Sequence, residues 1–242
     1  FNLFSNRYKW NKSYNKSAVG SISTKSIDSF INNIFDSLEE YPYKKDLKKI
    51  LIETYVKNEN LSDSIRSLLT FFFGKYGLLI LDPNDAILKK HFKSCLKLEI
   101  QNQSSFDLVS RQTNKLSKSY KTIIKPRELN LFYFNNEKRL RISKREEVYY
   151  LIDGKKKWSQ KQILKEIEDF PERFSPNVIL RTLYQETILP NIVYVGGPTE
   201  ISYWMQFKSL FSKMKIEFPI LLFRSFVLNI NFDHFKFLEK NK

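Results

Sequence analysis

Four polar residues between positions 177 and 185 have the types and the spacing of an anion-binding site. Asn177, Arg181, Tyr184 and Gln185 are spaced i, i+4, i+7 and i+8, which places them on one face of a helix. An arginine flanked by two amides and a phenol fits a carboxylate, a phosphate or sugar hydroxyls. The alternative is a solvated helix face with a surface arginine, although such faces are usually rich in Lys and Glu. We give the two interpretations equal weight.

A second group of candidates begins at the turn Gly196-Gly197-Pro198, between an expected strand and an expected helix. Glycines there let the backbone approach a ligand, and a helix N-terminus offers free N–H donors. Glu200 would repel a phosphate, so an amine, a sugar hydroxyl or a bound cation suits this place better. Glu200 could then hold an ammonium group or act as a general base. The alternatives are a plain turn and a charge that stabilises the helix start.

Asp82 follows the apolar run 78–81 and precedes a proline. That pattern predicts a buried parallel strand with an acid at its carboxyl end, where open α/β sheets bind ligands. For Asp82 itself we favour the alternative, a turn or an N-cap for a helix that begins at Ala86.

Other kinds of catalytic centre find little support. The sequence contains no G-x-G-x-x-G, Walker, G-x-S-x-G or H-E-x-x-H motif. Cys95 is the single cysteine, and His91 and His234 are the two histidines, so we expect no metal site and no disulfide scaffold. Neither histidine lies near a nucleophile turn, and we expect neither to be catalytic.

The charge of the chain is strongly positive. Its 242 residues include 41 Lys and Arg against 26 Asp and Glu, a formal net charge of +15, and 42% are hydrophobic. Such a field attracts nucleic acid, anionic membranes or phosphorylated small molecules, although an AT-rich genome would also enrich Lys. The lysines are scattered, with local clusters at 44–49, 89–97 and 155–161, so a nucleic-acid-binding module is the alternative function. No apolar run reaches the length of a membrane-spanning helix, and we expect a cytoplasmic protein.

Hydrophobic periodicity and turn residues predict the elements that carry these candidates. We expect helices over 27–38, 47–56, 61–73 (capped at Asn60 or Ser62), 86–118 (interrupted near 101–105), 159–170 (with a Ser159/Gln162 capping box), 175–189 (capped at Ser175) and 199–214. A β-meander over 129–152, with an Asn-rich turn at 135–137, is expected to end at Lys155-Lys156-Lys157. Strands over 191–195 and 219–223 alternate with helices, which predicts a parallel α/β sheet. The chain divides accordingly into 1–124, an α/β part with a helical connecting segment, an inserted meander at 125–158, and a second α/β part at 159–242.

Several long, ungapped motifs also match one known family. They are Phe174-Ser175-Pro176-Asn177, Arg181-x-x-Tyr184-Gln185-Glu186, Leu189-Pro190-Asn191, Gly196-Gly197-Pro198-x-Glu200-x-x-Tyr203-Trp204, Lys125-Pro126-Arg127-Glu128-Leu129-Asn130-Leu131-Phe132-Tyr133, Gly77-Leu78-Leu79-Ile80-Leu81-Asp82, Trp10 and Val19-Gly20. With these motifs, residues 10–228 resemble the cysteine-adding enzymes of bacillithiol biosynthesis, the cysteine ligase family.

The resemblance implies an incomplete Rossmann-like parallel sheet with helical and β-meander insertions, leading toward a coiled coil. It implies a homodimeric, cytosolic ligase that binds ADP or ATP and joins the carboxyl group of cysteine to the amine of glucosaminyl-malate. For that amide formation we expect Arg181 to bind a carboxylate or phosphate, with Tyr184 beside it, and Asn177 and Gln185 to orient the substrate. The Gly196-Gly197 backbone would donate hydrogen bonds, and Glu200 would act on the amine.

The chain also departs from the family pattern. The family's N-terminal portion, with its own Gly-rich turn and acidic and His motifs, has no counterpart here, and neither does most of the coiled coil. The first residue is Phe1. We therefore expect an internal fragment, or the product of a decayed gene, that is inactive in isolation, because a sheet without its first strands has exposed edges. A non-catalytic α/β scaffold is the third interpretation.

Overall fold

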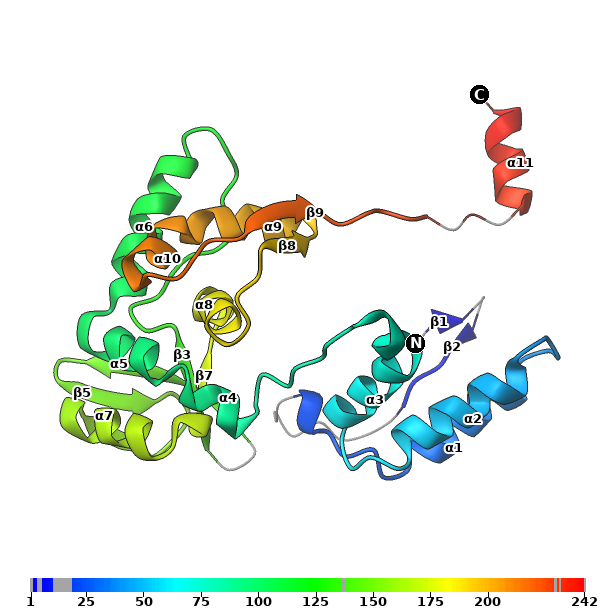
Figure 1. Ribbon diagram of the computed structural model, residues 1–242, viewed down its shortest axis with the longest axis horizontal. Helices are drawn as coiled ribbons and strands as arrows, with labels where there is room; N and C mark the ends of the chain where they lie inside the picture. Colours follow the sequence, from blue (N-terminus) through cyan, green and yellow to red (C-terminus); the bar gives the residue numbers. More distant parts are fainter. Residues whose placement is uncertain are drawn as a thin grey trace.

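The computed structural model describes residues 2–3, 6–10, 19–135, 138–228, 230 and 232–241. Figure 1 shows an N-terminal group of helices, a larger mixed α/β body, and a C-terminal helix that lies apart from both. Two short strands, β1 (Asn2–Leu3) and β2 (Asn6–Arg7), pair antiparallel.

The N-terminal helices are those that the periodicity predicts. They are α1 (Ile27–Asp36), α2 (Lys44–Tyr55) and α3 (Leu61–Phe73), with 3₁₀ turns η1 (Val19–Ser21) and η2 (Gly74–Tyr76). Asn60 caps α3, since its Oδ1 accepts a hydrogen bond from the backbone N–H of Asp63 at 2.9 Å. The apolar stripe of α1 provides a small separate core of Ile27, Ile31 and Phe35.

The prediction of a strand at residues 78–81 is wrong. This segment forms neither a helix nor a strand and runs between η2 and the next helix (Figure 1). Leu78 is 46% exposed and Leu79 is 65% exposed. An apolar run becomes a buried parallel strand only where neighbouring strands complete its hydrogen bonds and helices cover its faces, and those neighbours are missing here among the described residues.

The next helical stretch breaks where its polar residues indicate. It comprises α4 (Ala86–Lys90), α5 (Lys93–Asn102) and α6 (Ser104–Leu116). Gln103, in the left-handed conformation with φ of 48°, separates the last two helices. The interruption predicted near 101–105 is thus confirmed.

A five-stranded antiparallel sheet forms one part of the larger body, next to α5 and α7 (Gln160–Asp169) (Figure 1). Its spatial order is β6-β5-β4-β3-β7, from strands β3 (Leu131–Asn135), β4 (Lys138–Arg145), β5 (Val148–Leu151), β6 (Lys157–Ser159) and β7 (Phe174–Pro176). Strand alternation turns Leu131, Tyr133 and Ile142 into the main hydrophobic core. Helix α7 also contributes to this core and begins with the predicted Ser159/Gln162 capping box.

The meander is larger than the sequence predicts. Lys155-Lys156-Lys157 do not end the sheet, because Lys157 begins β6 and β7 then pairs with β3. Pro176 is tolerated because β7 is an edge strand. Residues 136 and 137 of the predicted Asn-rich turn lie outside the described residues. The division at 124 and 158 stays a prediction.

The C-terminal part contains the predicted alternation of helices and parallel strands. Its elements are η3 (Pro171–Arg173), α8 (Val178–Ile188), β8 (Val193–Gly196), α9 (Pro198–Trp204), η4 (Met205–Phe207), α10 (Lys208–Met214) and β9 (Ile220–Phe223). Strands β8 and β9 pair in parallel, with Val193 opposite Ile220 and Gly196 opposite Phe223. Trp204, Phe207 and Phe211 are fully buried behind this pair. The sequence-based α/β class is confirmed, with a small parallel sheet.

The chain ends in α11 (Phe232–Lys240), whose helix stands away from the body in Figure 1. Within the part of the chain that the structure describes, no helix is both long enough and apolar enough to cross a membrane.

Candidate functional site

A cavity of about 370 Å³ lies between helix α8 and the coil before α4. Its lining comprises Leu79, Leu81, Pro83, Arg181, Tyr184, Gln185, Ile188, Leu189 and Asn191. Three of the four residues predicted on one helix face are therefore together in one cavity. Apolar walls with a few polar groups are typical of small-molecule sites.

Arg181 supplies the positive charge of this cavity. One guanidinium nitrogen donates to Oε1 of Gln185 and another to the hydroxyl of Tyr203, each at a long 3.4 Å. Among the described residues, no carboxylate lies within ion-pair distance of Arg181. A half-buried guanidinium with donors to spare can bind a carboxylate or a phosphate through two parallel hydrogen bonds.

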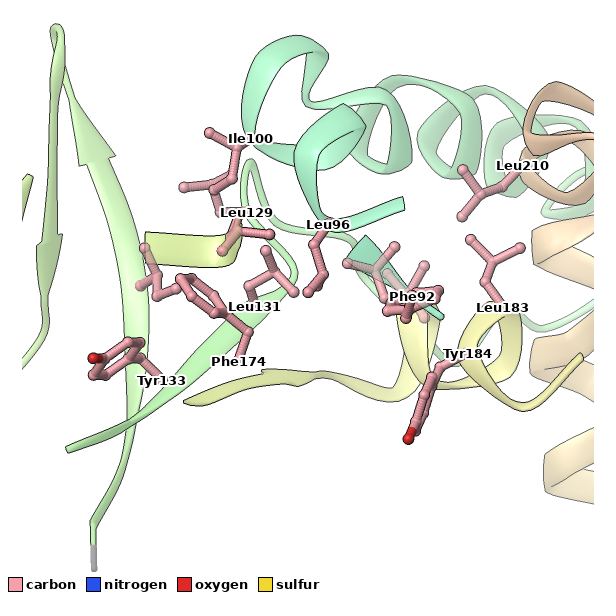
Figure 2. Packing of buried hydrophobic residues seen from close by; sticks show 14 of the residues in the cluster. Phe92, Leu96, Ile100, Leu129, Leu131, Tyr133, Phe174, Leu183, Tyr184 and Leu210 are labelled. Atoms are coloured by element: carbon pink, nitrogen blue, oxygen red, sulfur yellow. The ribbon is translucent and has the colours of Figure 1, made fainter. Parts of the chain in front are cut away.

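Tyr184 places a phenol in the same cavity. Its ring packs against Phe92 at 5.2 Å between centroids, and Figure 2 shows its hydroxyl pointing away from the hydrophobic cluster. The hydroxyl is buried and has no hydrogen-bond partner in the described structure. Burial, with the charges of Asp85 and Asp82, raises the pKa of Tyr184 to about 12, so this phenol is neutral at pH 7. An unpaired buried hydroxyl on a cavity wall is a place where a ligand can accept a hydrogen bond.

A buried carboxylate fixes the far end of the cavity. Glu186 is 3% exposed. Its Oε1 accepts hydrogen bonds from Nε2 of Gln185 and Nδ2 of Asn191, both at 3.0 Å, and its Oε2 accepts one from the backbone N–H of Asn191 at 2.8 Å. The Gln185 amide is thereby held with its oxygen toward Arg181.

Asn177 has a structural task instead. Its Oδ1 caps α8 by accepting from the N–H groups of Ile179 and Leu180, and its Nδ2 donates to Oδ1 of Asn130 at 2.7 Å. The prediction that Ser175 caps this helix is wrong, because Ser175 lies in β7 and pairs with Phe132. These hydrogen bonds occupy the side chain of Asn177, which does not line the cavity.

The glycine corner forms a neighbouring, separate group. Glu200 Oε2 accepts a hydrogen bond from the backbone N–H of Gly197 at 2.8 Å and so caps the start of α9. This N–H is one of the donors that we expected to bind a ligand. A Cβ at Gly196 would lie 2.7 Å from Cε1 of Tyr194, so only glycine fits this close approach. The guanidinium of Arg224 covers Gly197, where an added Cβ would lie 3.2 Å from an Nη atom.

A tyrosine side chain connects the cavity at Arg181 with the glycine corner. Tyr203 follows Glu200 by one helical turn, and its hydroxyl contacts Arg181. Burial raises the pKa of Tyr194 and the Trp204 side chain lowers it, while smaller effects come from the charges of Tyr203 and Glu200, which raise it, and of Arg181, which lowers it. Arg181 and Glu200 therefore act on the same phenol, although Glu200 does not line the cavity.

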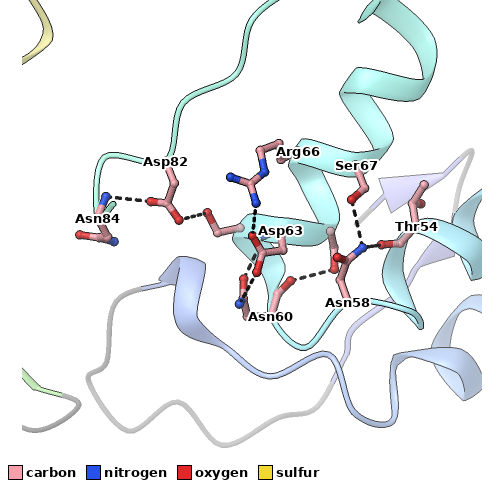
Figure 3. A network of polar contacts seen from close by, with 10 residues as sticks. Thr54, Asn58, Asn60, Asp63, Arg66, Ser67, Asp82 and Asn84 are labelled. Atoms are coloured by element: carbon pink, nitrogen blue, oxygen red, sulfur yellow. Dashed lines mark hydrogen bonds and ion pairs between the residues drawn. The ribbon is translucent and has the colours of Figure 1, made fainter. Parts of the chain in front are cut away.

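Asp82 lies in a turn, as favoured from the sequence. Figure 3 shows its carboxylate accepting from the hydroxyl of Ser62 at 2.9 Å and from the backbone N–H of Asn84 at 2.8 Å. The N-cap of α4 is Asp85, which accepts from Ile87 and Leu88. Asp82 does not line the cavity. Its negative charge is one of the causes that raise the pKa of Tyr184.

Residues 1–225 match the family described as "Bacillithiol biosynthesis BshC, N-terminal Rossmann-like domain". The chain belongs to this family. It is 42% identical over 228 residues to "Putative cysteine ligase BshC" of Flavobacterium johnsoniae, covering 94% of this chain and 43% of that protein. The protein of the same name in Christiangramia forsetii is 38% identical over 229 residues, 93% of this chain and 43% of the relative. The family resemblance read from the motifs is confirmed, and the chain spans less than half the length of these BshC relatives.

Sequence reasoning missed three residues of the site. Glu186 and Asn191 lie inside the quoted motifs, but their spacing in the sequence does not predict that their side chains hydrogen-bond each other. Arg224 directly follows β9, and only the parallel register brings it over Gly197. Among the described residues, no group of three His, Cys, Asp or Glu could hold a metal ion.

Proposed function

We propose that this chain supplies an anion-binding wall of a cysteine ligase of bacillithiol biosynthesis, with Arg181 as its central residue. The observation that supports this most directly is one cavity lined by Arg181, which has no ion-pair partner among the described residues, and by Tyr184, whose hydroxyl has no hydrogen-bond partner there. The reaction would join the carboxyl group of cysteine to the amine of glucosaminyl-malate: the C–N bond would form as the activated carboxyl group loses its leaving group and the amine loses a proton. That step needs an activated carboxyl group, which ATP would supply when bound.

Within this proposal each group has one role. Arg181 binds a carboxylate of malate or cysteine, or a phosphate of the nucleotide, by a bidentate contact. Gln185, oriented by Glu186, accepts from Arg181 and so positions the guanidinium, and Tyr184 donates its O–H to the anion. Glu200 and the glycine corner are kept as the place where the substrate amine would lie, since Oε1 of Glu200 is not used by Gly197. The whole enzyme, as a cytoplasmic homodimer, is part of the same proposal.

Among the described residues that line the cavity, Arg181 is the one cation that could contact a phosphate of ADP or ATP. The cavity alone offers no second cation for a triphosphate. We therefore assign Arg181 to a single carboxylate or phosphate group.

The test replaces residues of the complete Flavobacterium johnsoniae relative that align with this chain. The variant corresponding to Arg181→Gln should lose at least about 100-fold in the rate of bacillithiol formation, because a charge-assisted bidentate contact is worth about 3 kcal/mol. The matched control is an Arg→Gln substitution at an exposed arginine of the same relative, outside the matched motifs. Equal activity of the two variants would refute the assignment of Arg181.

A further inference from the structure

A second cavity, of about 430 Å³, lies on the antiparallel sheet and is strongly basic. It is lined by Arg127, Phe132, Lys138, Arg139, Leu140, Arg141, Ile152 and Asp153. Four of these side chains carry a positive charge, and Asp153 is the one acid among the described lining residues. None of the eight lines the cavity at Arg181.

Strand alternation explains why the charges gather there. Leu140 and Ile142 of β4 pack against or within the main core, so Arg139 and Arg141 point to the opposite face of the sheet. In register with them, Phe132 stands opposite Arg141. Two residues apart on one strand, the two arginines emerge about 7 Å from one another, and Arg127 comes from the segment that precedes β3.

One of these arginines is already oriented by the protein. The guanidinium of Arg139 stacks on the ring of Phe132 at 3.8 Å from its centroid. Its Nε donates to Oγ of Ser175 at 2.9 Å and one Nη donates to the carbonyl of Pro176 at 3.0 Å. Arg139 is therefore rigid, whereas no ion pair between the described residues engages Arg127 or Arg141.

We propose that this basic cavity binds a compact polyanion with two adjacent phosphate groups. Four cations that share one cavity repel one another, and a bound anion relieves that repulsion. The volume exceeds that of a single phosphate and lies in the range of small-ligand sites. Arg141 and the Nη atom of Arg139 that neither Ser175 nor Pro176 accepts from are two separate sets of donors, which match two phosphoryl groups better than one. The site is independent of the cavity on α8.

The test measures binding of inorganic pyrophosphate and of orthophosphate to the 242-residue chain by isothermal titration calorimetry. Pyrophosphate should bind with one-to-one stoichiometry and at least about tenfold more tightly than orthophosphate. Arg141→Gln should weaken it at least about tenfold. Arg145→Gln, at the end of the same strand and outside the cavity, removes the same charge and should change affinity less than about twofold. The same titrations on Arg181→Gln identify any pyrophosphate bound at the α8 cavity, so this proposal and the function at Arg181 can fail separately.

Two further arms identify the source of the ligand. If ADP binds more tightly than pyrophosphate and is equally sensitive to Arg141→Gln, the diphosphate belongs to a nucleotide; equal affinities assign it to the diphosphate group alone. Equal losses in the Arg141 and Arg145 variants, or no saturable pyrophosphate binding, would overturn the proposal. So would tight binding of a single-stranded decanucleotide that pyrophosphate does not displace, which would make this face a nucleic-acid surface instead.

Discussion

The unpartnered hydroxyl of Tyr184 leads to an unusual expectation for Tyr184→Phe. A buried hydroxyl without a hydrogen bond costs about 1–3 kcal/mol of folding free energy, because it loses its bonds to water and gains none. Since Tyr184 is 3% exposed and its hydroxyl has no partner in the described structure, removing that oxygen should raise the free energy of unfolding by about 1 kcal/mol. Urea unfolding of the 242-residue chain, followed by tryptophan fluorescence, measures this change.

Tyr133→Phe is the matched comparison. Tyr133 is also buried, at 2% exposure, but its hydroxyl contacts a carboxylate oxygen of Glu166 and accepts from Nζ of Lys156 at 2.7 Å. Losing these charge-assisted bonds should lower the free energy of unfolding by about 1–3 kcal/mol. The same chemical change thus has opposite signs at the two positions. If Tyr184→Phe destabilises the chain as much as Tyr133→Phe does, the hydroxyl of Tyr184 has a partner and is not available to a ligand.

Three other substitutions test particular contacts by urea unfolding. Glu186→Gln should cost about 1–3 kcal/mol, since its new amide N–H₂ would face the donors of Asn191; an unchanged stability would contradict the role given to this carboxylate. Gly196→Ala should cost about 1–3 kcal/mol by overpacking against Tyr194, whereas Gly74→Ala, with a Cβ 3.3 Å from one Thr70 methyl, is the control and should change stability by less than about 1 kcal/mol. Burial lowers the pKa of Lys89 to about 8 from its ordinary 10.5. The unfolded chain therefore binds more protons between these two pH values, and the free energy of unfolding should rise with pH from about 8 to 10.5. Lys89→Met should remove that rise, and a pH profile identical to that of the unmodified chain would refute the assignment to Lys89.

Local signals predicted local structure well. The side chain of Asn60 and the pair Ser159/Gln162 reach only three residues, so their spacing suffices to place the starts of α3 and α7. The face shared by Arg181, Tyr184 and Gln185 is likewise a property of one helix, and the structure places all three in one cavity.

Predictions failed where a distant partner decides the outcome. Ser175-Pro176 has the pattern of a helix start, yet pairing with β3, more than forty residues earlier, makes it a strand and moves the cap to Asn177. The run 78–81 has the composition of a buried strand without the neighbours that would make it one. The contact between Arg224 and Gly197 depends on the register of β8 and β9, which no single segment specifies.

The most direct test of the central claim is whether Arg181 binds an anionic group of a ligase reactant. Calorimetric titration of glucosaminyl-malate, cysteine and ADP into the chain, with Arg181→Gln and Arg111→Gln in parallel, measures it. We predict that at least one reactant binds the unmodified chain and Arg111→Gln equally, and binds Arg181→Gln at least about tenfold more weakly, a loss of about 1.4 kcal/mol or more. Equal affinity of all three proteins for every reactant would contradict the account.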